Sequence, residues 1–531
     1  MIRVTQRPAG VDCEGRRYCT QTIARPQFFR TRIPRFLFGL ALIDITLRTA
    51  SAGCGGYETL SSGEPEFRLM SDKPTLGRMM PMHLGFNLES VPFQLSYWNT
   101  ANNTVRPAVT DYLRAMSGMV YRYPGGAVSN FVDLNAARGP TKLRQPQRLV
   151  DWQPPEPVRF GIPEYADFAA LAGGKMWGVL NIYGGIASKL DPHVLASRNR
   201  EVVRSLRGRG PVLRWEIGNE MYLPKYHTDG SEYAQRILPT LDAMLKLDRT
   251  LKPVVGIATF DIGSNKADEF NRQLIRGLAG YEIEFAAHYY YDGKPGGPPV
   301  AWATDTLCDK IEKIERQIGK PPSIWITEHA RWPPGRAGDK DWKNSWNESN
   351  DLSAALSVAD FLLAVSQIDA VKGAFLHSLG GAKGPWVLFH ESRLDKQIYP
   401  SVVLETARLL NAPLSSQVLP TRSRSSSWKS KNLRGVFFRR ADNNLGLAAV
   451  NRGDASATVR LFVPELAGRK VVALHQNISN DYLHARNTDE APHSVSLRKY
   501  EETLRFDENG HAIINLAGFS ISRLDFVAMP N

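Results

Sequence analysis

Short, nearly continuous apolar runs alternate with longer amphipathic stretches from about residue 80 to residue 380. The eight apolar runs are Met82–Asn87, Met119–Arg122, Met176–Ile182, Val212–Ile217, Val254–Thr259, Ile283–His288, Ser323–Thr327 and Gly373–His377. Runs of this kind are typical of strands that are buried on both faces of a parallel sheet. Helical spacing fills the stretches between them, as in Tyr233–Leu251 and Asp351–Gln367. The pattern predicts an α/β fold, a (β/α)8 TIM barrel over residues 79–400.

The pattern changes after about residue 400 to short alternating segments separated by turn residues. These segments are Gly435–Arg440, Leu445–Val450, Ala457–Phe462, Lys470–His475, Ala512–Leu516 and Ser520–Val527. Short alternating strands with turns between them predict an all-β, antiparallel sandwich domain over residues 401–531. Residues 54–78 are interpreted as a linker that can add a strand to this sandwich.

The first 53 residues have the pattern of an export signal. Arg30, Arg32 and Arg35 precede the apolar run 36–43, and small residues follow at 50–53. A basic, then apolar, then small-residue order predicts a secretory leader, and the run is too short to span a membrane. The alternatives are a lipoprotein signal with a lipid anchor at Cys54 and an uncleaved disordered tail. A periplasmic, secreted or outer-surface location is therefore expected.

Composition excludes several other classes of function. The chain of 531 residues has a net charge of +13, but no stripe of Lys and Arg interleaved with aromatic residues. We therefore expect no nucleic-acid partner, although a mildly basic body can attract acidic polymers. No Cys/His spacing suggests a metal site, and we expect no cofactor. The sequence does not determine the oligomeric state.

Two carboxylates follow predicted strands on opposite sides of the barrel. Glu220 comes directly after the fourth run and Glu328 after the seventh. Active sites of this barrel lie at the C-terminal ends of the strands, so both side chains are expected at one rim. Retaining hydrolysis of a glycosidic bond needs such a pair, one carboxyl to protonate the leaving oxygen and one to attack the anomeric carbon. Glu216, inside the fourth run, is expected to point into the barrel or to a structural partner.

Other candidate residues end neighbouring runs or lie in the loops after them. His329 and His377 are expected behind the residues that touch the ligand. Four tryptophans fall in the loops after the seventh and eighth runs, where one or two could stack on sugars: Trp332, Trp342, Trp346 and Trp386.

These motifs resemble clan A of the glycoside hydrolases, and within it the family 51 α-L-arabinofuranosidases and the related families 39 and 79. Asn219-Glu220 ending the fourth strand and Glu328 ending the seventh are similar to the clan's motifs. The stretch 121–126, Tyr-Arg-Tyr-Pro-Gly-Gly, is similar to an Arg-x-Pro-Gly-Gly motif of the subgroup. Similar matches are Gly85–Glu89, Gly161–Tyr165 and His288–Tyr290. The resemblance covers residues 80–400, and the C-terminal sandwich fits it as well.

The resemblance implies a role for each matched residue. Glu220 would be the acid/base and Glu328 the nucleophile. Asn219 would bind the sugar 2-hydroxyl, and Glu89 would bind hydroxyls of the terminal sugar. Tyr290 would hold the nucleophile's oxygen, with His288 nearby. Arg122 would orient a carboxylate at the barrel floor; for Arg122 and His288 a purely structural hydrogen bond is the alternative.

The resemblance implies a retaining exo-glycosidase that releases a terminal sugar, α-L-arabinofuranose by first guess, from a polysaccharide or oligosaccharide. The chain departs from the family pattern at Ala127, where the family has an Asn, and in the context Thr327–Ala330. These departures leave the sugar open. The alternatives are a β-xylosidase, a β-glucuronidase or heparanase-like hydrolase, and a catalytically silent carbohydrate-binding barrel.

Overall fold

The computed structural model describes residues 58–59, 64–70, 81–89, 95–116, 118–151, 153–259, 262–293, 299–380, 384–425 and 432–529. The expected leader and Cys54 lie outside these residues. The part from Ala50 to Asn531 forms one compact unit. Within the described residues, no helix combines the length and the apolar character needed to cross a membrane.

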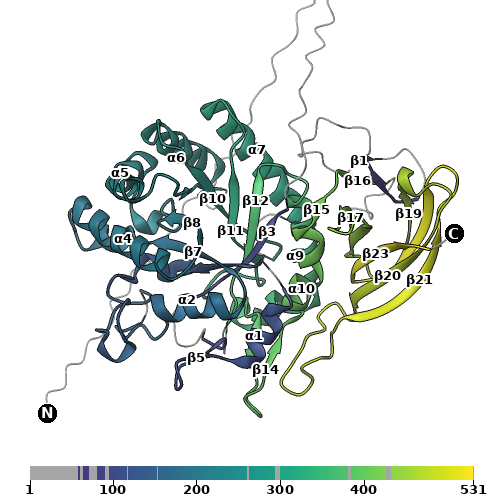
Figure 1. Cartoon of the computed structure of the whole chain (residues 1–531), viewed down its shortest axis with the longest axis horizontal. Coiled ribbons are helices and arrows are strands. Elements are labelled where there is room, and N and C mark those ends of the chain that lie inside the picture. Colours follow the sequence, from purple (N-terminus) through teal and green to yellow (C-terminus); the bar gives the residue numbers. More distant parts are fainter. Residues whose placement is uncertain are drawn as a thin grey trace, which may run out of the picture. The chain divides into compact units, whose positions relative to one another are not determined.

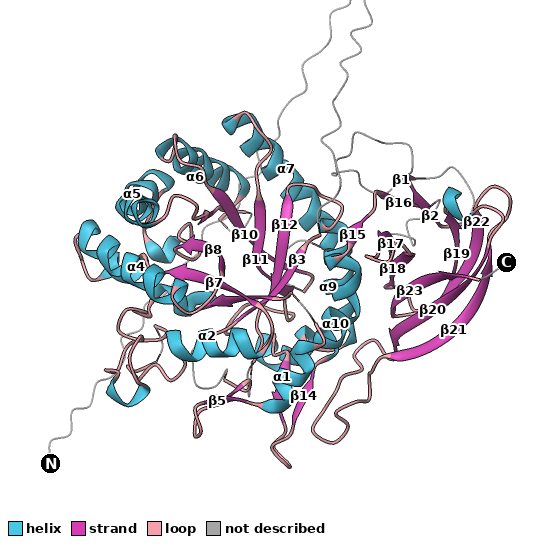
Figure 2. Ribbon diagram, viewed as in Figure 1, coloured by secondary structure: helices cyan, strands magenta, loops and turns pink. Residues whose placement is uncertain are grey.

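Eight parallel strands close into a barrel (Figures 1 and 2). The order around the barrel is β10-β11-β12-β3-β6-β7-β8-β9. The strands are β3 His83–Asn87, β6 Val120–Tyr123, β7 Lys175–Leu180, β8 Val212–Ile217, β9 Pro253–Gly256, β10 Glu284–Tyr291, β11 Ile324–Arg331 and β12 Val371–Leu376. Each overlaps one of the eight apolar runs, so the barrel predicted from the sequence is confirmed.

Large apolar side chains fill the interior of the barrel. Trp177 from β7 and Trp325 from β11 meet edge to face at 5.0 Å, and Phe375 from β12 packs against Trp177 at the same distance. All three side chains are buried. The barrel is therefore a packed core and not a pore, which leaves only the rim for chemistry.

Helices surround the barrel (Figure 2). They are α1 Pro107–Arg114, α2 Ile162–Leu171, α3 Tyr183–Ala187, α4 Pro192–Arg207, α5 Gly230–Leu247, α6 Ser264–Gly277, α7 Val300–Ile318, α8 Lys340–Asn344, α9 Leu352–Val365 and α10 Val402–Ser415. Side-chain caps define several of their starts: Asp191 caps α4, Asp229 caps α5 and Asp351 caps α9. Each cap satisfies backbone N–H groups that a first helical turn leaves without a partner.

Two sheets form the sandwich beyond the barrel. The first has the order β1 (Glu58–Thr59), β16 (Thr421–Ser425), β2 (Glu66–Leu69), β19 (Ala457–Phe462) and β22 (His511–Leu516). The second has the order β15 (Gln417–Val418), β17 (Leu433–Arg439), β18 (Leu445–Asn451), β23 (Ser520–Ala528), β20 (Lys470–Ser479) and β21 (Arg498–Arg505). Apolar residues of both sheets meet in one buried cluster.

The sandwich differs from the sequence prediction in its strand directions and in the strands β15, β16 and β21, which were not predicted. The first sheet is mixed and not purely antiparallel, because β2 from the N-terminal segment pairs with β19 in parallel. Strand β21 was not predicted, because it is an exposed edge strand whose residues are mostly charged or polar. Such a strand carries no alternating apolar signal.

Helices α9 and α10 lie between the barrel and the sandwich (Figure 1). All residues of α9 are buried, in agreement with a sequence that is apolar on every side of the helix. Asp360 is the charged residue within α9, and two arginines of the sandwich bind it. This helix therefore contacts the barrel with one face and the sandwich with the other.

Gly85 in β3 offers a test of barrel packing. A Cβ at this position would lie 2.4 Å from the backbone oxygen of Val120 and 2.5 Å from the ring of Phe375. We expect Gly85→Ala to destabilise the fold by about 2 kcal/mol or more, because the backbone and the ring have no space to retreat. Gly256→Ala in β9 is the matched control, since a Cβ there meets nothing within 4 Å. Denaturant unfolding curves that shift equally for both variants would contradict this account of the interior.

Candidate active site

Glu220 lies at the barrel rim just after β8. The strand ends at Ile217, and Gly218 then turns the chain with a φ of 81°. Glu220 itself has a φ of 49°, in the left-handed region that a non-glycine residue adopts only at a cost. Its side chain is 17% exposed, so it faces the opening of the site. Backbone strain of this type concentrates at functional positions, where surrounding structure enforces it.

Glu328 lies within β11 and is almost fully buried. Its Oε1 accepts a hydrogen bond of 2.7 Å from Arg122 Nη1, and its Oε2 accepts one of 2.9 Å from the hydroxyl of Tyr290. Arg122 comes from β6 and Tyr290 from β10, on either side of the barrel mouth. The carboxylate is therefore held in one orientation from two directions.

Arg122 is fully buried and binds residues of three other strand ends. It donates to both oxygens of Glu216, at 2.7 and 2.8 Å, and to the Oδ1 atoms of Asn87 and Asn219 at 2.6 and 2.7 Å. Burying a guanidinium requires such pairing, because an unpaired buried charge is very costly. Glu216 also accepts a hydrogen bond from the indole of Trp177, so its partners are structural.

His288 lies between the two candidate catalytic carboxylates. Its Nδ1 is 3.3 Å from Oε1 of Glu220 and 3.7 Å from Oε2 of Glu328. Because both oxygens lie near the same nitrogen, they are no more than about 7 Å apart, a bound that includes the ~5–5.5 Å of a retaining pair. The opposite nitrogen, Nε2, lies 3.0 Å from Thr327 Oγ1, which fixes the ring orientation.

The surroundings of Glu328 favour its ionised form. Burial alone would raise the pKa of Glu328, but the charges of His288, His377 and Arg122 and the hydrogen bond from Tyr290 outweigh it and hold the pKa at about 2. Burial raises the pKa of Tyr290 well above its usual value, so this residue stays protonated and remains a donor. Glu328 is therefore ionised at neutral pH.

The two histidines beside Glu328 differ in their ionisation. Burial lowers the pKa of His377, which leaves its ring neutral near pH 7. Burial also acts to lower the pKa of His288, but the charges of Glu328 and Glu220 outweigh it and raise the pKa above its usual value. The two carboxylates thus favour the charged form of the His288 ring, whereas burial favours the neutral form of His377.

Glu89 and His377 form a second polar pair on the opposite side of Glu328. His377 Nε2 lies 3.2 Å from Glu89 Oε1, and His377 Nδ1 lies 3.6 Å from Glu328 Oε2. Gly126 packs against this pair: a Cβ there would lie 2.7 Å from Glu89 Oε1. The Pro-Gly-Gly stretch thus brings bare backbone next to the two side chains.

Three buried side-chain nitrogen atoms lie close to Glu328 or to its partner Arg122. Among the residues that the structure describes, Asn219 Nδ2, His288 Nδ1 and His377 Nδ1 are buried without a hydrogen-bond partner. Each belongs to a residue that surrounds Glu328 or binds its partner Arg122. Buried polar groups are normally satisfied, so Asn219 Nδ2 marks a position where a ligand hydroxyl could accept a hydrogen bond, whereas the two histidine nitrogens face the carboxylates of Glu220 and Glu328.

The aromatic residues of the rim gather around Tyr290. Trp332 and Trp386 lie 5.4 and 5.2 Å from the Tyr290 ring, and Trp342 lies 6.1 Å from Trp332. Trp346 packs on Trp342 and is farther from Tyr290 in this chain of contacts. Trp332 and Trp386 are thus the two tryptophans that border the site.

His329 does not reach the site. Its ring packs against Phe361 of α9, and its Nδ1 lies 3.0 Å from the hydroxyl of Tyr291. Burial lowers the pKa of His329 to about 3, so the ring is neutral. Its neighbour Glu328 faces inward because successive residues of a strand point to opposite faces.

Three residues of the site were not predicted from the sequence. Asn87 ends β3, donates to the backbone oxygens of Thr327 and Leu376 and accepts from Arg122. Asn130 in the 3-10 helix η2 (Gly126–Asn130) donates to the backbone oxygen of Asn219. The hydroxyl of Tyr222 lies 3.3 Å from Glu220. Asn87 ends a predicted strand and was detectable; Asn130 lies in a short 3-10 helix and Tyr222 in a turn, and neither has a periodic signal.

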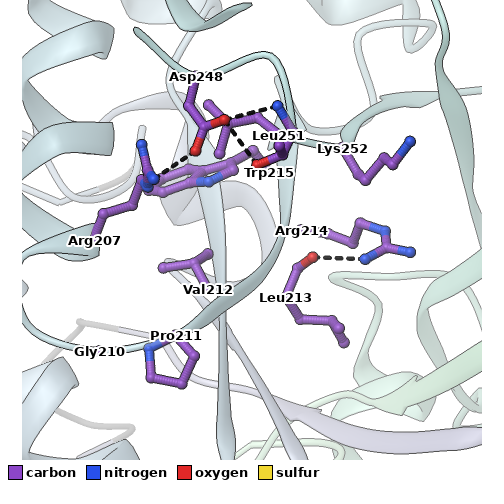
Figure 3. Close-up of a pocket in the computed structure, with 11 residues that line it drawn as sticks. Arg207, Gly210, Pro211, Val212, Leu213, Arg214, Trp215, Asp248, Leu251 and Lys252 are labelled. Carbon is purple, nitrogen blue, oxygen red and sulfur yellow. Dashed lines mark hydrogen bonds and ion pairs between the residues drawn. The ribbon is translucent and has the colours of Figure 1, made fainter.

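A separate cavity of about 420 Å³ lies at the opposite end of β8 (Figure 3). It is lined by residues 207, 210–215, 248 and 250–252. Its charged side chains already form ion pairs: Arg207 with Asp248, Arg214 with Glu284 and Lys252 with Glu282. The cavity lies at the N-terminal end of the barrel strands, which in this fold usually contributes to stability and not to catalysis.

In the described part of the chain, no cluster of His, Cys, Asp and Glu could hold a metal ion.

The sequence resembles two curated arabinofuranosidases. It is 26% identical over 291 residues to a probable α-L-arabinofuranosidase C of Aspergillus clavatus, covering 49% of this chain and 56% of that protein. It is 23% identical over 246 residues to an intracellular exo-α-(1→5)-L-arabinofuranosidase of Streptomyces lividans, covering 44% and 37%. The match thus spans about half or less of these relatives. No family model matches the sequence.

Solved structures resemble this fold over most of its length. An α-L-arabinofuranosidase of Thermotoga maritima superposes with a TM-score of 0.69 at 19% identity, covering 88% of this chain and all of that one. A family 51 arabinofuranosidase of Xanthomonas axonopodis superposes with a TM-score of 0.69 at 17% identity, covering 87% of this chain and all of that one. The chain therefore has the barrel-plus-sandwich fold of these proteins and resembles family 51 of clan A.

The raised pKa of His288 gives a testable pH dependence. Its ring should keep its proton to a higher pH than a free imidazole and lose it as the pH rises through the raised pKa. Glu328→Gln should lower this pKa, because it removes one of the two negative charges that raise it. Glu284→Gln is the control, because Glu284 lies at the other end of β10, the strand that carries His288. The measurement is an NMR titration of the histidine ring signals; equal pKa values in all three proteins would exclude the coupling.

Proposed function

We propose that the protein is a retaining glycoside hydrolase that removes a terminal sugar, α-L-arabinofuranose by first choice, from a polysaccharide or oligosaccharide. The observation that carries the proposal is the placement of Glu220 and Glu328 on either side of His288 Nδ1, at 3.3 and 3.7 Å. The resemblance to arabinofuranosidases in sequence and fold supports it.

The mechanism follows from the different surroundings of the two carboxylates. Glu328 is buried, ionised and oriented by Arg122 and Tyr290, which suits attack on an anomeric carbon. Glu220 is partly exposed at the opening, where a leaving group and then a water molecule can reach it. In the first step Glu328 forms a glycosyl–enzyme bond while Glu220 protonates the leaving oxygen. In the second step Glu220 takes a proton from water, which displaces Glu328 from the sugar.

The polar groups around Glu328 suit the sugar. Asn219 Nδ2 is positioned to donate to the 2-hydroxyl, since Arg122 fixes the other end of its amide. Glu89 and His377 can bind further hydroxyls on the opposite side. The near-complete burial of Glu328, Asn219 and Glu89 suits a short pocket that admits one sugar at a chain end. This favours exo action.

A neutral sugar fits the site better than a uronic acid. Arg122 is the arginine at the site floor, and Glu216, Glu328 and two asparagines already engage its donors. Glu89, Glu216, Glu220 and Glu328 together make the described surroundings acidic. The carboxylate of a uronic acid would therefore be repelled. The acidic surroundings therefore disfavour the β-glucuronidase or heparanase-like alternative, whereas they are compatible with a β-xylosidase.

The location of the protein remains a proposal from its sequence. The basic, apolar and small-residue order of residues 1–53 supports export, with Cys54 as an alternative lipid anchor. An exported hydrolase would meet polysaccharides that a cell does not take up.

Substitution of the two carboxylates tests the mechanism. We expect Glu328→Gln to abolish turnover of aryl glycosides, because the amide cannot displace the leaving group. Glu220→Ala should slow glycosides with poor leaving groups by about 10²–10⁴-fold, and those with good leaving groups much less in the first step. Azide should rescue Glu220→Ala by replacing the activated water. Glu284→Gln is the control. NMR of the first-formed product should show retained configuration; inverted product, or full activity of Glu328→Gln, would reject the mechanism.

A panel of nitrophenyl glycosides tests the choice of sugar. We expect the α-L-arabinofuranoside to give the highest kcat/KM, with the β-D-xyloside lower and the β-D-glucuronide inactive because of the acidic surroundings. A preference for the glucuronide would contradict the electrostatic argument. Binding of glycans without any turnover would support a silent carbohydrate-binding barrel instead.

A further inference from the structure

The C-terminal end of β10 carries two residues that contact the candidate nucleophile and then leaves the barrel. His288 and Tyr290 face Glu328, whereas Tyr291 faces outward and stacks on Phe361 of α9 at 4.5 Å. The next residue, Asp292, has a φ of 48°. The strand therefore ends in a backbone turn that an L-residue adopts only when its surroundings hold it there.

Contacts from outside the barrel hold Asp292. Its Oδ2 accepts a hydrogen bond of 2.6 Å from Ser357 of α9 and one of 2.7 Å from Nη2 of Arg452. Arg452 directly follows strand β18 of the sandwich. A side chain of the second domain thus binds the residue two positions after Tyr290.

Arg452 also binds the helix that separates the two domains. Its Nη1 donates to Asp360 Oδ2 at 3.0 Å, while Arg434 of β17 donates to Asp360 Oδ1 at 2.6 Å. The Asp360 carboxylate is buried and the Arg452 side chain is 25% exposed. A planar guanidinium that bridges two carboxylates at fixed angles restricts both of them more than a flexible ammonium would.

We propose that Arg452 is a positioning residue of the active site: through Asp292 it fixes the end of β10 and thereby the places of Tyr290 and His288 relative to Glu328. The inference rests on the proposed glycosidase function and extends the site to the sandwich domain. The sandwich then contributes to catalysis without touching the substrate.

The physical reason is that Asp292 and Tyr290 are close in the chain. Only Tyr291 separates them, and the stacking of its ring on Phe361 of α9 leaves little slack in this segment. A shift of the turn is therefore transmitted to the Tyr290 hydroxyl, whose hydrogen bond of 2.9 Å orients the nucleophile. Small displacements of orienting groups reduce catalysis far more than they reduce substrate binding.

The test compares Arg452→Met with Arg434→Met in the full-length protein. Each variant removes one cation from the cluster around Asp360, so we expect both to lower Tm, and Arg452→Met to lower it more because it also loses the ion pair with Asp292. Only Arg452→Met removes a contact of the β10 turn, where Ser357 remains as a partner of Asp292. It should lower kcat by about tenfold with KM within about twofold, whereas Arg434→Met should leave both near the wild-type values. Asp292→Asn keeps a residue that tolerates the left-handed turn and should reproduce the loss in kcat.

A readout that is independent of turnover separates this inference from the proposed function. The NMR titration of the His288 ring should shift in Arg452→Met and Asp292→Asn but not in Arg434→Met. If wild type hydrolyses no glycoside, the proposed function fails, while the titration still decides whether Arg452 positions β10. Identical titrations and identical kinetics in Arg452→Met and Arg434→Met would overturn the inference. If Arg452→Met does not fold, Asp292→Asn decides by the same two measurements.

Discussion

The buried guanidinium of Arg122 is the interaction on which the rest of the site depends. It joins β6 to Glu216 of β8, to Asn87 of β3 and to Glu328 of β11, with no exposed surface of its own. A charge at this depth is tolerable only because two carboxylates and two amides surround it. The same contacts that make Arg122 tolerable in the core fix the carboxylate of Glu328. Stability of the barrel floor and orientation of the site are therefore one requirement.

The two candidate catalytic carboxylates acquire different properties from their positions on the rim. Glu328 lies within a strand, where partners from β6 and β10 can reach it and keep it ionised. Glu220 lies beyond the end of its strand on a left-handed turn, where its oxygens face the opening. His288 lies between them and takes its raised pKa from both. The positions of the two residues relative to their strand ends thus give identical side chains different surroundings, as the two roles proposed for them require.

The sandwich is joined to the barrel by charged as well as apolar contacts. Helix α9 is buried on all sides, yet it carries Asp360, which needs cations from the sandwich to be stable there. Arg452 meets this need and at the same time binds Asp292 on the barrel rim. An ion pair that is required for the interface therefore also connects the second domain to β10. Without Arg452, Asp292 would keep the hydrogen bond from Ser357 but lose the ion pair with the sandwich.

The sequence by itself determined the eight strands, because each buried strand is an unbroken apolar run. It also placed Glu220 and Glu328 at one rim, because parallel strands align their C-terminal ends. It did not reveal Asn130, in a short 3-10 helix, or Tyr222, in a turn, because neither segment has a periodic signal. Nor did it reveal the pairing of β2 with β19, which lie far apart in the chain. Only the tertiary structure decided that His329 turns away while His377 turns in, and that Arg452 reaches Asp292. Those facts depend on side-chain direction and on contacts between distant segments, and no local pattern of residue types encodes either.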